Sequence, residues 1–362
     1  MKQIIHVLGS PIPHHNHTML RFLAEQLQPQ LPKQAIKQVL VVGSGYQEQY
    51  PSLYIQEFDS KKSIAQAVCR FAKHDPQHYF YLHGQFNFPL WFAIFFGKLP
   101  PERLTWQMWG ADLHEDSQQW KFKLAYPLRR FIQKKLISVA GYQGDLAYFK
   151  QYINPNVQGH LVYFPSKMHH SFQTMKKEKQ KSDKLTILLG NSGDPSNRHL
   201  VGLEQIKQQL GDNVRIIIPM GYPEHNGDYI AQVSTHATRL FAQSAVQILT
   251  EKMPFQDYLA LLNQCDVAYF IFQRQQGVGS LCLLTQFNVP VVLHPKNTFI
   301  EDMRLYQVPF LLQNQVSEQR IRETQQKLTA LDKETIGFFE PHFMAGWLAI
   351  LTQILQQGEG NA

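Results

Sequence analysis

The 362-residue sequence is poor in cysteine and has no long apolar run. Its three cysteines, Cys69, Cys265 and Cys282, are far apart and follow no metal-binding spacing. We therefore expect reduced core thiols in a cytosolic protein. No run approaches the roughly 20 apolar residues that a membrane span needs, because the best candidate, residues 86–97, is too short and contains Pro89. These absences predict a protein that is soluble or bound peripherally to a membrane.

Acidic residues are fewer than basic ones. The chain carries 35 Lys and Arg against 28 Asp and Glu, which gives a formal net charge of +7 and a pI of about 9.1. This surplus favours anionic partners such as nucleotides, nucleic acid or an acidic membrane surface. The length exceeds that of an ordinary single domain, and an apolar content of 44% is typical of a protein with buried cores.

Short apolar runs alternate with helical patterns through both halves of the chain. Strands are predicted within residues 4–9, 38–43, 78–84, 103–110, 136–141, 185–193, 214–221, 245–255, 266–272 and 290–294. Helices are predicted at residues 18–27, 63–72, 89–96, 255–265, 279–287 and 341–357. Apolar strands separated by helices indicate parallel sheets covered on both faces.

The pattern divides the chain into two doubly wound α/β domains. Residues 1–165 form the first domain, and the polar stretch 166–184, which has no apolar periodicity, is typical of a linker. Residues 185–340 form the second domain, and residues 341–362 carry a final helix. Ligands of such sheets bind beyond the carboxyl ends of the strands, so the functional residues are expected in the loops that follow strands.

The first glycine loop of the second half is "LLGNSGDPSN". Asn191, Ser192 and Gly193 follow a strand, and Ser196 and Asn197 are placed to cap the next helix. Unpaired backbone N–H groups at a helix start bind anions. The loop has neither P-loop nor G-x-G-x-x-G spacing, so a tight turn with helix caps is an equally good interpretation.

The second glycine loop is "QRQQGVGSLCLL". Gly277 and Gly279 flank the start of a helix, Ser280 lies in its first turn, and Arg274 can add a charge-assisted contact to phosphate. A tight turn is again the alternative. Two such loops in one domain favour a nucleotide-diphosphate site.

Polar side chains also follow strands in the first half. The segment "PIPHHNH" holds His14, His15 and His17 in a predicted loop, for which a substrate-facing role is favoured over a metal site. His83 and Asp112 each follow a predicted strand, where an imidazole or carboxylate can act as a general base or bind sugar hydroxyls. A helix N-cap is the equally weighted alternative for Asp112.

A basic segment, residues 119–136, carries six cations interleaved with aromatic and aliphatic side chains and no acidic residue. Such a segment suits an anionic membrane surface. A solvated helix with its apolar side in the core is the alternative. No nucleic-acid motif supports a groove for DNA or RNA.

Seven segments, taken in order, resemble the motifs of one enzyme family. They are "IHVLGSPIPHHNHTMLRF", "FYLHGQFN", "WGADL", "YPLRR", "GNSGD", "PMGYP" and "YFIFQRQQGVGSLCLL". Spanning roughly residues 4–347, they make the chain similar to the TDP-Fuc4NAc:lipid II Fuc4NAc transferases, glycosyltransferase family 56, where Fuc4NAc is 4-acetamido-4,6-dideoxy-D-galactose.

The resemblance implies transfer of Fuc4NAc from dTDP-Fuc4NAc to a polyprenyl-pyrophosphate-linked ManNAcA-GlcNAc disaccharide (lipid II), which gives lipid III in enterobacterial common antigen biosynthesis. It implies a GT-B-like fold of two facing doubly wound parallel-sheet domains with a cleft between them. The C-terminal domain would hold the donor, and the final helix would cross back to the N-terminal, acceptor-facing and membrane-facing domain. The enzyme would be peripheral, on the cytoplasmic side of the cell inner membrane, and would need no cofactor or metal ion.

Many GT-B enzymes carry E-x-x-G-x-x-x-x-E before a proline-led strand. Here Gln275 or Gln276 replaces the first Glu, and Leu283 and Leu284 occupy the neighbourhood of the second, which in relatives contacts the ribose. The sugar of dTDP has no 2′-hydroxyl for such a Glu to bind. The basic pair that retaining members carry after the first strand of this domain is also missing, which leaves Arg274 and Arg198 as substitutes.

The residues are assigned to three roles on this basis. Expected catalytic residues are Asp112, His83 and Arg274. Expected donor and phosphate contacts are Asn191, Ser192, Gly193, Met220, Gly221, Tyr222, Gln276, Gly277, Gly279 and Ser280. Expected acceptor contacts are His14, His15, Asn16, Gln85, Arg129 and Arg130. A GT-B transferase for another nucleotide sugar and a non-catalytic sugar-nucleotide-binding protein are the alternatives.

Overall fold

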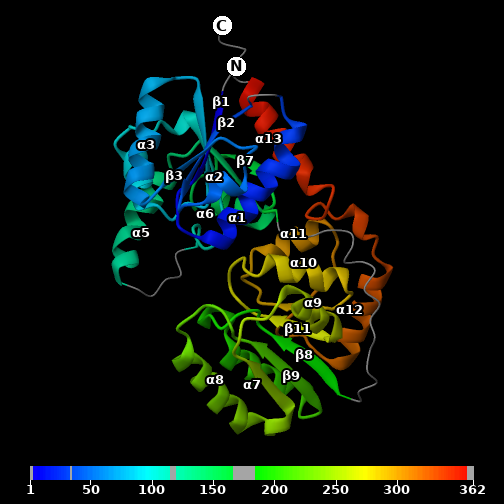
Figure 1. The fold of residues 1–362 in the computed structure, drawn as a ribbon. Helices are drawn as coiled ribbons and strands as arrows, with labels where there is room; N and C mark the ends of the chain where they lie inside the picture. The colour runs from blue at the N-terminus through cyan, green and yellow to red at the C-terminus, as the bar shows by residue number, and fades with distance from the viewer. Residues whose placement is uncertain (1–2, 33–34, 115–119, 166–183, 357–362) are drawn as a thin grey trace. The chain divides into compact units, whose positions relative to one another are not determined.

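A computed structural model describes residues 3–32, 35–114, 120–165 and 184–356, with only the backbone at Lys121. The chain forms two compact units (Figure 1). Unit 1 comprises Met1–Ser166 and Pro341–Ala362, and unit 2 comprises Lys167–Glu340. The predicted linker, apart from Lys184, lies outside the described residues.

Unit 1 is built on a seven-stranded parallel sheet in the order β3-β2-β1-β4-β5-β6-β7. Its strands are β1 (Gln3–Leu8), β2 (Ile36–Val42), β3 (Ile55–Phe58), β4 (His78–His83), β5 (Leu104–Gln107), β6 (Ser138–Gly141) and β7 (Gln158–Leu161). Its helices are α1 (Pro13–Phe22), which runs into a π-helix (Leu23–Leu27), α2 (Tyr46–Gln49), α3 (Lys61–His74), α4 (Phe88–Phe95), α5 (Trp120–Gln133), α6 (Gln143–Tyr152) and α13 (Phe343–Gln356).

Unit 2 has a six-stranded parallel sheet in the order β10-β9-β8-β11-β12-β13. The strands are β8 (Leu185–Leu189), β9 (Val214–Pro219), β10 (Val246–Leu249), β11 (Val267–Phe270), β12 (Val291–Leu293) and β13 (Leu311–Leu312). The helices are α7 (His199–Leu210), α8 (Gly227–Leu240), α9 (Phe255–Gln264), α10 (Val278–Gln286), α11 (Phe299–Leu305) and α12 (Glu318–Ala330). Short 3-10 turns occupy Gln28–Gln30, Pro101–Arg103, Pro195–Asn197, Gln243–Ala245 and Lys333–Thr335.

The central strands of both sheets are buried along their length. All six residues of β4 and all four of β11 are buried, as expected for parallel strands with helices on both faces. Each unit has its own hydrophobic core, centred on residues such as Phe80 and Trp106 in unit 1 and Ile216 and Tyr269 in unit 2. The predicted fold class, two doubly wound parallel-sheet α/β domains, is confirmed.

The last helix, α13, returns to unit 1 and packs against β1, β7 and the π-helix, which it adjoins in Figure 1. The indole N–H of Trp347 donates to the Tyr163 carbonyl at 2.9 Å, and the Trp347 ring lies 5.0 Å from that of Phe22. Gly346 permits this packing, because a Cβ there would come within 2.2 Å of the Leu161 carbonyl oxygen.

Some elements differ from those predicted from the sequence pattern. α1 begins at Pro13, not at residue 18, so the histidines of "PIPHHNH" lie on a helix rather than in the predicted loop. Proline in the first turn of a helix explains this early start. The short strands β3 and β7 have little apolar alternation and were not predicted. In the parts of the chain that the structure describes, no helix is both long and apolar enough to cross a bilayer.

Candidate functional site

The strand order reverses at one place in each sheet, between β1 and β4 in unit 1 and between β8 and β11 in unit 2. The crevice at the carboxyl ends of such strands is the usual ligand site of a doubly wound sheet. The loops after these four strands and the first turns of the helices that follow them contain many of the residues singled out from the sequence.

Helix α10 of unit 2 starts without a side-chain cap. Gly277 at its N-cap has the left-handed conformation, with φ +63°, and Val278, Gly279 and Ser280 form the first turn. The first intrahelical bond runs from the Leu281 N–H to the Gly277 carbonyl. The amides of the first turn therefore remain available to an anion. The predicted positions of the two glycines and Ser280 around the helix start are confirmed.

Gly277 packs against the loop that follows β8. A Cβ added there would lie 2.9 Å from Nδ2 of Asn191, so this approach requires glycine. Ser280 is held in place because its hydroxyl lies 2.7 Å from the Tyr258 hydroxyl. The two glycine loops, 80 residues apart in sequence, thus form one surface at the ends of β8 and β11.

Two of the three amides expected to hold phosphate in the β8 loop, those of Asn191 and Gly193, are already bonded. The Asn191 N–H donates to Asn197 Oδ1 at 3.0 Å, and the Gly193 N–H donates to the Tyr222 carbonyl at 2.6 Å. The Ser192 hydroxyl accepts from Asn197 Nδ2 at 2.9 Å. These groups shape the loop, and the Asn191 side chain replaces the backbone as the group that can reach a ligand.

The residues before α7 differ from the expected caps. Asp194 caps the 3-10 turn by accepting from the Ser196 N–H at 2.9 Å, and the Ser196 hydroxyl donates to Gln276 Oε1 at 2.8 Å. Gln276 therefore ties the two loops together. The N-cap residue of α7 is Arg198, in the left-handed region with φ 58°.

Four buried polar atoms at this end of the unit 2 sheet lack hydrogen-bond partners among the described residues. They are Asn191 Oδ1, Arg198 Nη1, His199 Nε2 and Gln275 Oε1. Leaving such groups unpaired costs about 1–3 kcal/mol each, and native proteins rarely accept that cost without a ligand or water. The loops after β8 and β11 contribute three of these atoms and the first residue of α7 contributes the fourth, so this end of the sheet is a candidate for a polar ligand site.

Sequence reasoning missed His294, which follows β12 at the same edge of the sheet. Its Nδ1 accepts from the Lys296 N–H at 3.0 Å, which places its proton on Nε2, 3.3 Å from the Gln273 amide nitrogen. Burial, then the charges of Arg198 and Lys296, lower the pKa of His294 to about 4. A neutral N–H donor thus lies in the field of two cations. The position of His294 after an apolar strand was the available signal.

Other expected donor contacts are less well placed. The Met220 side chain is buried in the unit 2 core, so the expectation that it contacts the donor is not supported. Gly221 is needed for packing, because a Cβ there would come within 2.2 Å of the Glu251 carbonyl oxygen. Tyr222 is 55% exposed. Arg274 is half-buried, and its Nη1 lies 3.4 Å from the Gln275 carbonyl oxygen.

In unit 1, Asp112 is fully enclosed. Its carboxylate accepts from the Gln85 N–H at 2.7 Å, the Trp109 N–H at 2.7 Å and the Trp106 indole at 2.8 Å. Burial raises the pKa of Asp112, and these three bonds together with nearby Arg129 oppose the rise. Such a carboxylate orders the loops after β4 and β5. The geometry favours this structural role over the catalytic one.

His83 is likewise buried. Its Nε2 lies 2.8 Å from Nδ1 of His6, and its Nδ1 lies 3.0 Å from the Gln107 side-chain oxygen. Burial lowers the pKa of His83 to about 3, so the ring is neutral near pH 7. With 1% exposure it cannot touch an acceptor in this conformation, and a structural role is favoured over catalysis here too.

A second set of unpaired atoms lies at the carboxyl ends of β1, β4 and β5. They are Ser10 Oγ, His15 Nδ1, Gln85 Nε2 and Trp109 Nε1, again without partners among the described residues. The His15 ring lies 4.9 Å from the Trp109 ring and 5.3 Å from the Phe164 ring. Burial, and next His14, lower the pKa of His15 to about 4. Neutral donors beside aromatic rings are suited to a saccharide.

The other residues expected to contact the acceptor differ in their exposure. His14 is exposed on α1, whereas Asn16 is buried and donates to the Ser10 carbonyl at 3.1 Å. Arg129 is buried with its guanidinium 4.9 Å from the Tyr126 ring centre, and Arg130 donates to Gln133 Oε1 at 2.9 Å. Arg129 is too buried to meet lipid phosphates as expected, whereas Arg130 is half-buried and its contact with lipid stays a prediction.

No metal cluster is apparent at either end. Across the described ranges, no group of three or more His, Cys, Asp or Glu side chains is arranged to hold a metal ion.

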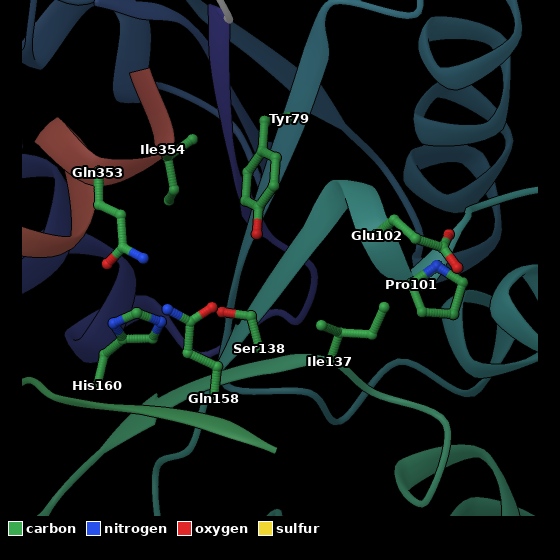
Figure 2. Close-up of a pocket in the computed structure, with 9 residues that line it drawn as sticks. All are labelled: Tyr79, Pro101, Glu102, Ile137, Ser138, Gln158, His160, Gln353 and Ile354. Atoms are coloured by element: carbon green, nitrogen blue, oxygen red, sulfur yellow. The ribbon is translucent and has the colours of Figure 1, made fainter. Parts of the chain in front are cut away.

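A pocket at the opposite, amino-terminal edge of the unit 1 sheet is shown in Figure 2, where side chains from several strands and from α13 line it. Its buried hydroxyls satisfy one another: Tyr79 Oη lies 3.0 Å from Thr105 Oγ1, which lies 2.8 Å from Ser138 Oγ. The carboxyl-end loops are therefore the better candidate sites.

Solved structures of low sequence identity share this fold. A glycosyltransferase from Rickettsia africae has a TM-score of 0.65 at 10% identity, with 98% of each chain covered. The N-terminal domain of Candida albicans trehalose-6-phosphate phosphatase also scores 0.65 at 10% identity, covering 98% of this chain and 97% of that one. HepE of Anabaena, solved in complex with UDP, scores 0.58 at 14% identity, with 99% of each chain covered.

These likenesses and the two parallel-sheet units define the class as a GT-B-like glycosyltransferase fold. The family model described as 4-alpha-L-fucosyltransferase, glycosyl transferase group 56, matches residues 1–356. The chain belongs to this family and is a glycosyltransferase, which confirms the family resemblance found from the sequence.

Proposed function

We propose that the protein transfers Fuc4NAc from dTDP-Fuc4NAc to the polyprenyl-pyrophosphate-linked ManNAcA-GlcNAc disaccharide, lipid II, and so forms lipid III of enterobacterial common antigen. The seven family motifs in the sequence support this donor and acceptor. The uncapped start of α10 and the unpaired polar atoms at the same end of the unit 2 sheet carry the proposal, because together they would suit a sugar diphosphate.

The donor diphosphate would lie against the first turn of α10. The Val278, Gly279 and Ser280 amides would meet its oxygens. The Arg198 and Arg274 guanidiniums would supply positive charge beside it. The His294 N–H is the additional neutral donor.

The same groups would assist the reaction itself. The bond from the sugar's anomeric carbon to the β-phosphate oxygen breaks, and its electron pair leaves on dTDP. A hydroxyl oxygen of the acceptor forms the new bond to that carbon and releases its proton. Donors fixed in advance stabilise the charge that grows on the leaving diphosphate, which is often the largest contribution to catalysis.

The acceptor sugar would be bound by unit 1. Trp109 offers a ring and an unpaired indole N–H, and His15 and Gln85 offer unpaired nitrogens nearby. Gly84 makes room for that ring, since a Cβ there would come within 2.3 Å of it.

A dTDP donor agrees with the absence of the second glutamate of the GT-B motif, because its deoxyribose has no 2′-hydroxyl. Leu283 and Leu284 are both buried, so these positions provide no carboxylate to bind a 2′-hydroxyl. A donor built on UDP is the alternative, since HepE of the same fold was solved with UDP.

Two measurements test the proposal. Because a nucleotide that binds only the folded state raises the melting temperature, dTDP should raise it more than UDP at equal concentration. Incubation with dTDP-Fuc4NAc and membrane-extracted lipid II should then give a product one Fuc4NAc residue larger. Activity with UDP sugars alone would overturn the donor assignment, and transfer to other acceptors alone would overturn the lipid II assignment.

The acceptor's lipid places the reaction at a membrane. We therefore propose that the enzyme works as a peripheral protein on the cytoplasmic side of the inner membrane.

A further inference from the structure

Helix α4 of unit 1 presents a row of phenylalanines to solvent. Phe92, Phe95 and Phe96 are 43%, 39% and 66% exposed, and their i, i+3, i+4 spacing places them on one side. The opposite side of the helix, with Leu90, Trp91 and Ile94, is buried in the core. The exposed row is therefore not needed to hold the helix on the sheet.

Helix α5 repeats this arrangement. Trp120, Leu124 and Phe131 are 66%, 71% and 49% exposed, at i, i+4 and i+11 along one side. Its buried side includes Ile132, which packs in the unit 1 core. A helix that is apolar on both sides and covered on one leaves a surface whose exposure needs an explanation.

The two rows are continuous. The Phe95 and Phe131 rings lie 6.0 Å apart, and the Lys135 ammonium lies 5.9 Å and 4.6 Å from their respective centres. Lys98, Lys123 and Lys134 are also exposed on this α4–α5 surface. No Asp or Glu occurs within residues 88–98 or 120–137. Aromatic side chains and lysines thus form one cationic, apolar surface.

We propose that the α4–α5 surface docks on an anionic phospholipid bilayer. Aromatic rings are favoured at the headgroup level, and each lysine near an anionic surface strengthens binding about fivefold. A second copy of this chain is a poorer occupant, because pairing two such surfaces would bring their lysines together. The inference rests on the proposed function only in that a lipid-linked acceptor explains why docking is useful.

Docking of this kind uses the basic segment predicted from the sequence, but not the two arginines expected to meet lipid phosphates. Arg129 is buried against the Tyr126 ring, and Arg130 is half-buried and donates to Gln133. Lys98, Lys123, Lys134 and Lys135 are exposed. The lysines therefore supply the contact with lipid phosphates. The phenylalanines of α4, which were not predicted to contact a membrane surface, supply the apolar contact.

The test is flotation of the full-length protein with vesicles. Vesicles of phosphatidylethanolamine and phosphatidylglycerol (3:1) should bind it, phosphatidylcholine vesicles should bind it at least tenfold less, and 0.5 M salt should weaken binding. Phe95→Ser with Phe96→Ser and Leu124→Ser, and separately Lys98→Gln with Lys134→Gln and Lys135→Gln, should each lower binding at least tenfold. Exposed controls, Tyr54→Ser with Leu305→Ser, and Lys62→Gln with Lys73→Gln and Lys150→Gln, should bind normally.

Trp120 provides a second measurement. Its emission should shift to the blue and be quenched by brominated lipid on binding, and Trp120→Phe should remove that quenching. Unchanged vesicle binding by both sets of variants would overturn the proposal. A concentration-dependent dimer that the serine variants abolish would assign the surface to a second copy instead.

The outcomes also separate docking from the proposed function. Docking variants should keep the dTDP-induced rise in melting temperature and the transfer to detergent-solubilised lipid II. A wild-type protein that binds anionic vesicles but transfers no Fuc4NAc would contradict the proposed function and leave the docking surface standing.

Discussion

The two reversal points of the molecule share a topology and differ in chemistry. In unit 1 the helix after β4 is closed, because Asn87 caps it by accepting from the Leu90 N–H and Pro89 occupies its first turn. In unit 2 the start of α10, the helix after β11, is uncapped, because Gly277 has no side chain to cap it. The two sets of unpaired atoms named above differ in the same way: the unit 1 set has imidazole, indole, amide and hydroxyl groups, and the unit 2 set includes the Arg198 guanidinium.

This difference shows how one scaffold can serve two substrates. In unit 1 the Asn87 cap occupies one N–H at the start of α4, and the unpaired groups named above are neutral donors beside aromatic rings, which suit a sugar. An open start beside cations suits a diphosphate. The predictions below test that division, from the largest expected effect to the smallest.

Loss of the unit 2 cation should have the largest effect. Arg198→Asn keeps a residue that tolerates the left-handed region and removes the charge, so turnover should fall about 10²- to 10³-fold while the melting temperature stays near wild type. Arg274→Ala should also lower turnover more than stability. Kinetics with dTDP-Fuc4NAc and calorimetry measure both quantities.

The matched control is Arg215→Asn, at an exposed position of β9 where the side chain contacts Gln247. It should leave turnover unchanged. Near-normal turnover in both Arg198→Asn and Arg274→Ala would contradict a diphosphate site at the end of the unit 2 sheet.

Acid should destabilise unit 1 through its buried histidine pair. The pKa of His83 is lowered to about 3 and that of His6 well below 6.5, mainly by burial. Below pH 6.5 the unfolded chain therefore takes up protons that the folded unit refuses. Stability is full above pH 6.5 and falls toward pH 3, by up to about 1.4 kcal/mol per pH unit for each imidazole.

Tryptophan emission can follow this loss, because all five tryptophans belong to unit 1. His6→Asn retains a donor toward His83 and should reduce the pH dependence of the urea midpoint between pH 6.5 and 5. His74→Asn, at an exposed position of α3, is the control and should keep the wild-type dependence. An unchanged slope in His6→Asn would show that the pair does not set the acid limit.

Much of the fold was predictable, since strands such as β4 and β11 are apolar runs and their helices have clear periodicity. The Gly277 loop was also predictable, because glycine before a helical pattern has a direct conformational meaning. Asp112 was not: its sequence position after a strand is that of a catalytic carboxylate, and only the fold shows the Trp106 indole bonded to it.

The donor groups of the unit 2 site show the same limit. Arg198 has a left-handed backbone conformation just before α7, and His294 follows β12, a strand far from the β8–α7 turn in sequence. Hydrogen-bond satisfaction depends on tertiary packing, so the unpaired atoms that define both sites could not be found from residue spacing.

Closing the approach between the two unit 2 loops should have an intermediate effect. Gly277→Ala places a Cβ 2.9 Å from Asn191 Nδ2 at φ +63°, so it should cost about 1–2 kcal/mol of stability from the backbone and lower turnover about tenfold by displacing the α10 amides. Gly45→Ala is in the same left-handed region, with φ +78° and ψ 10°, and a Cβ there would meet only Gln49 Nε2, at 3.9 Å. It should lose comparable stability and keep normal turnover, and equal turnover losses in both variants would contradict the phosphate role of α10.

The smallest expected effect tests the neutral character of the unit 1 site. Trp109→Phe keeps an aromatic ring and removes an indole N–H that has no partner within the described residues, so it should raise the acceptor KM about fivefold without a matching loss of stability. Trp106→Phe is the opposite case, because that N–H donates to Asp112; it should cost about 1–3 kcal/mol of stability and leave the acceptor KM nearly unchanged. If Trp109→Phe instead lost stability at an unchanged acceptor KM, the Trp109 indole would be a structural group like that of Trp106. The interpretation of the unit 1 site as a neutral sugar site would then be contradicted.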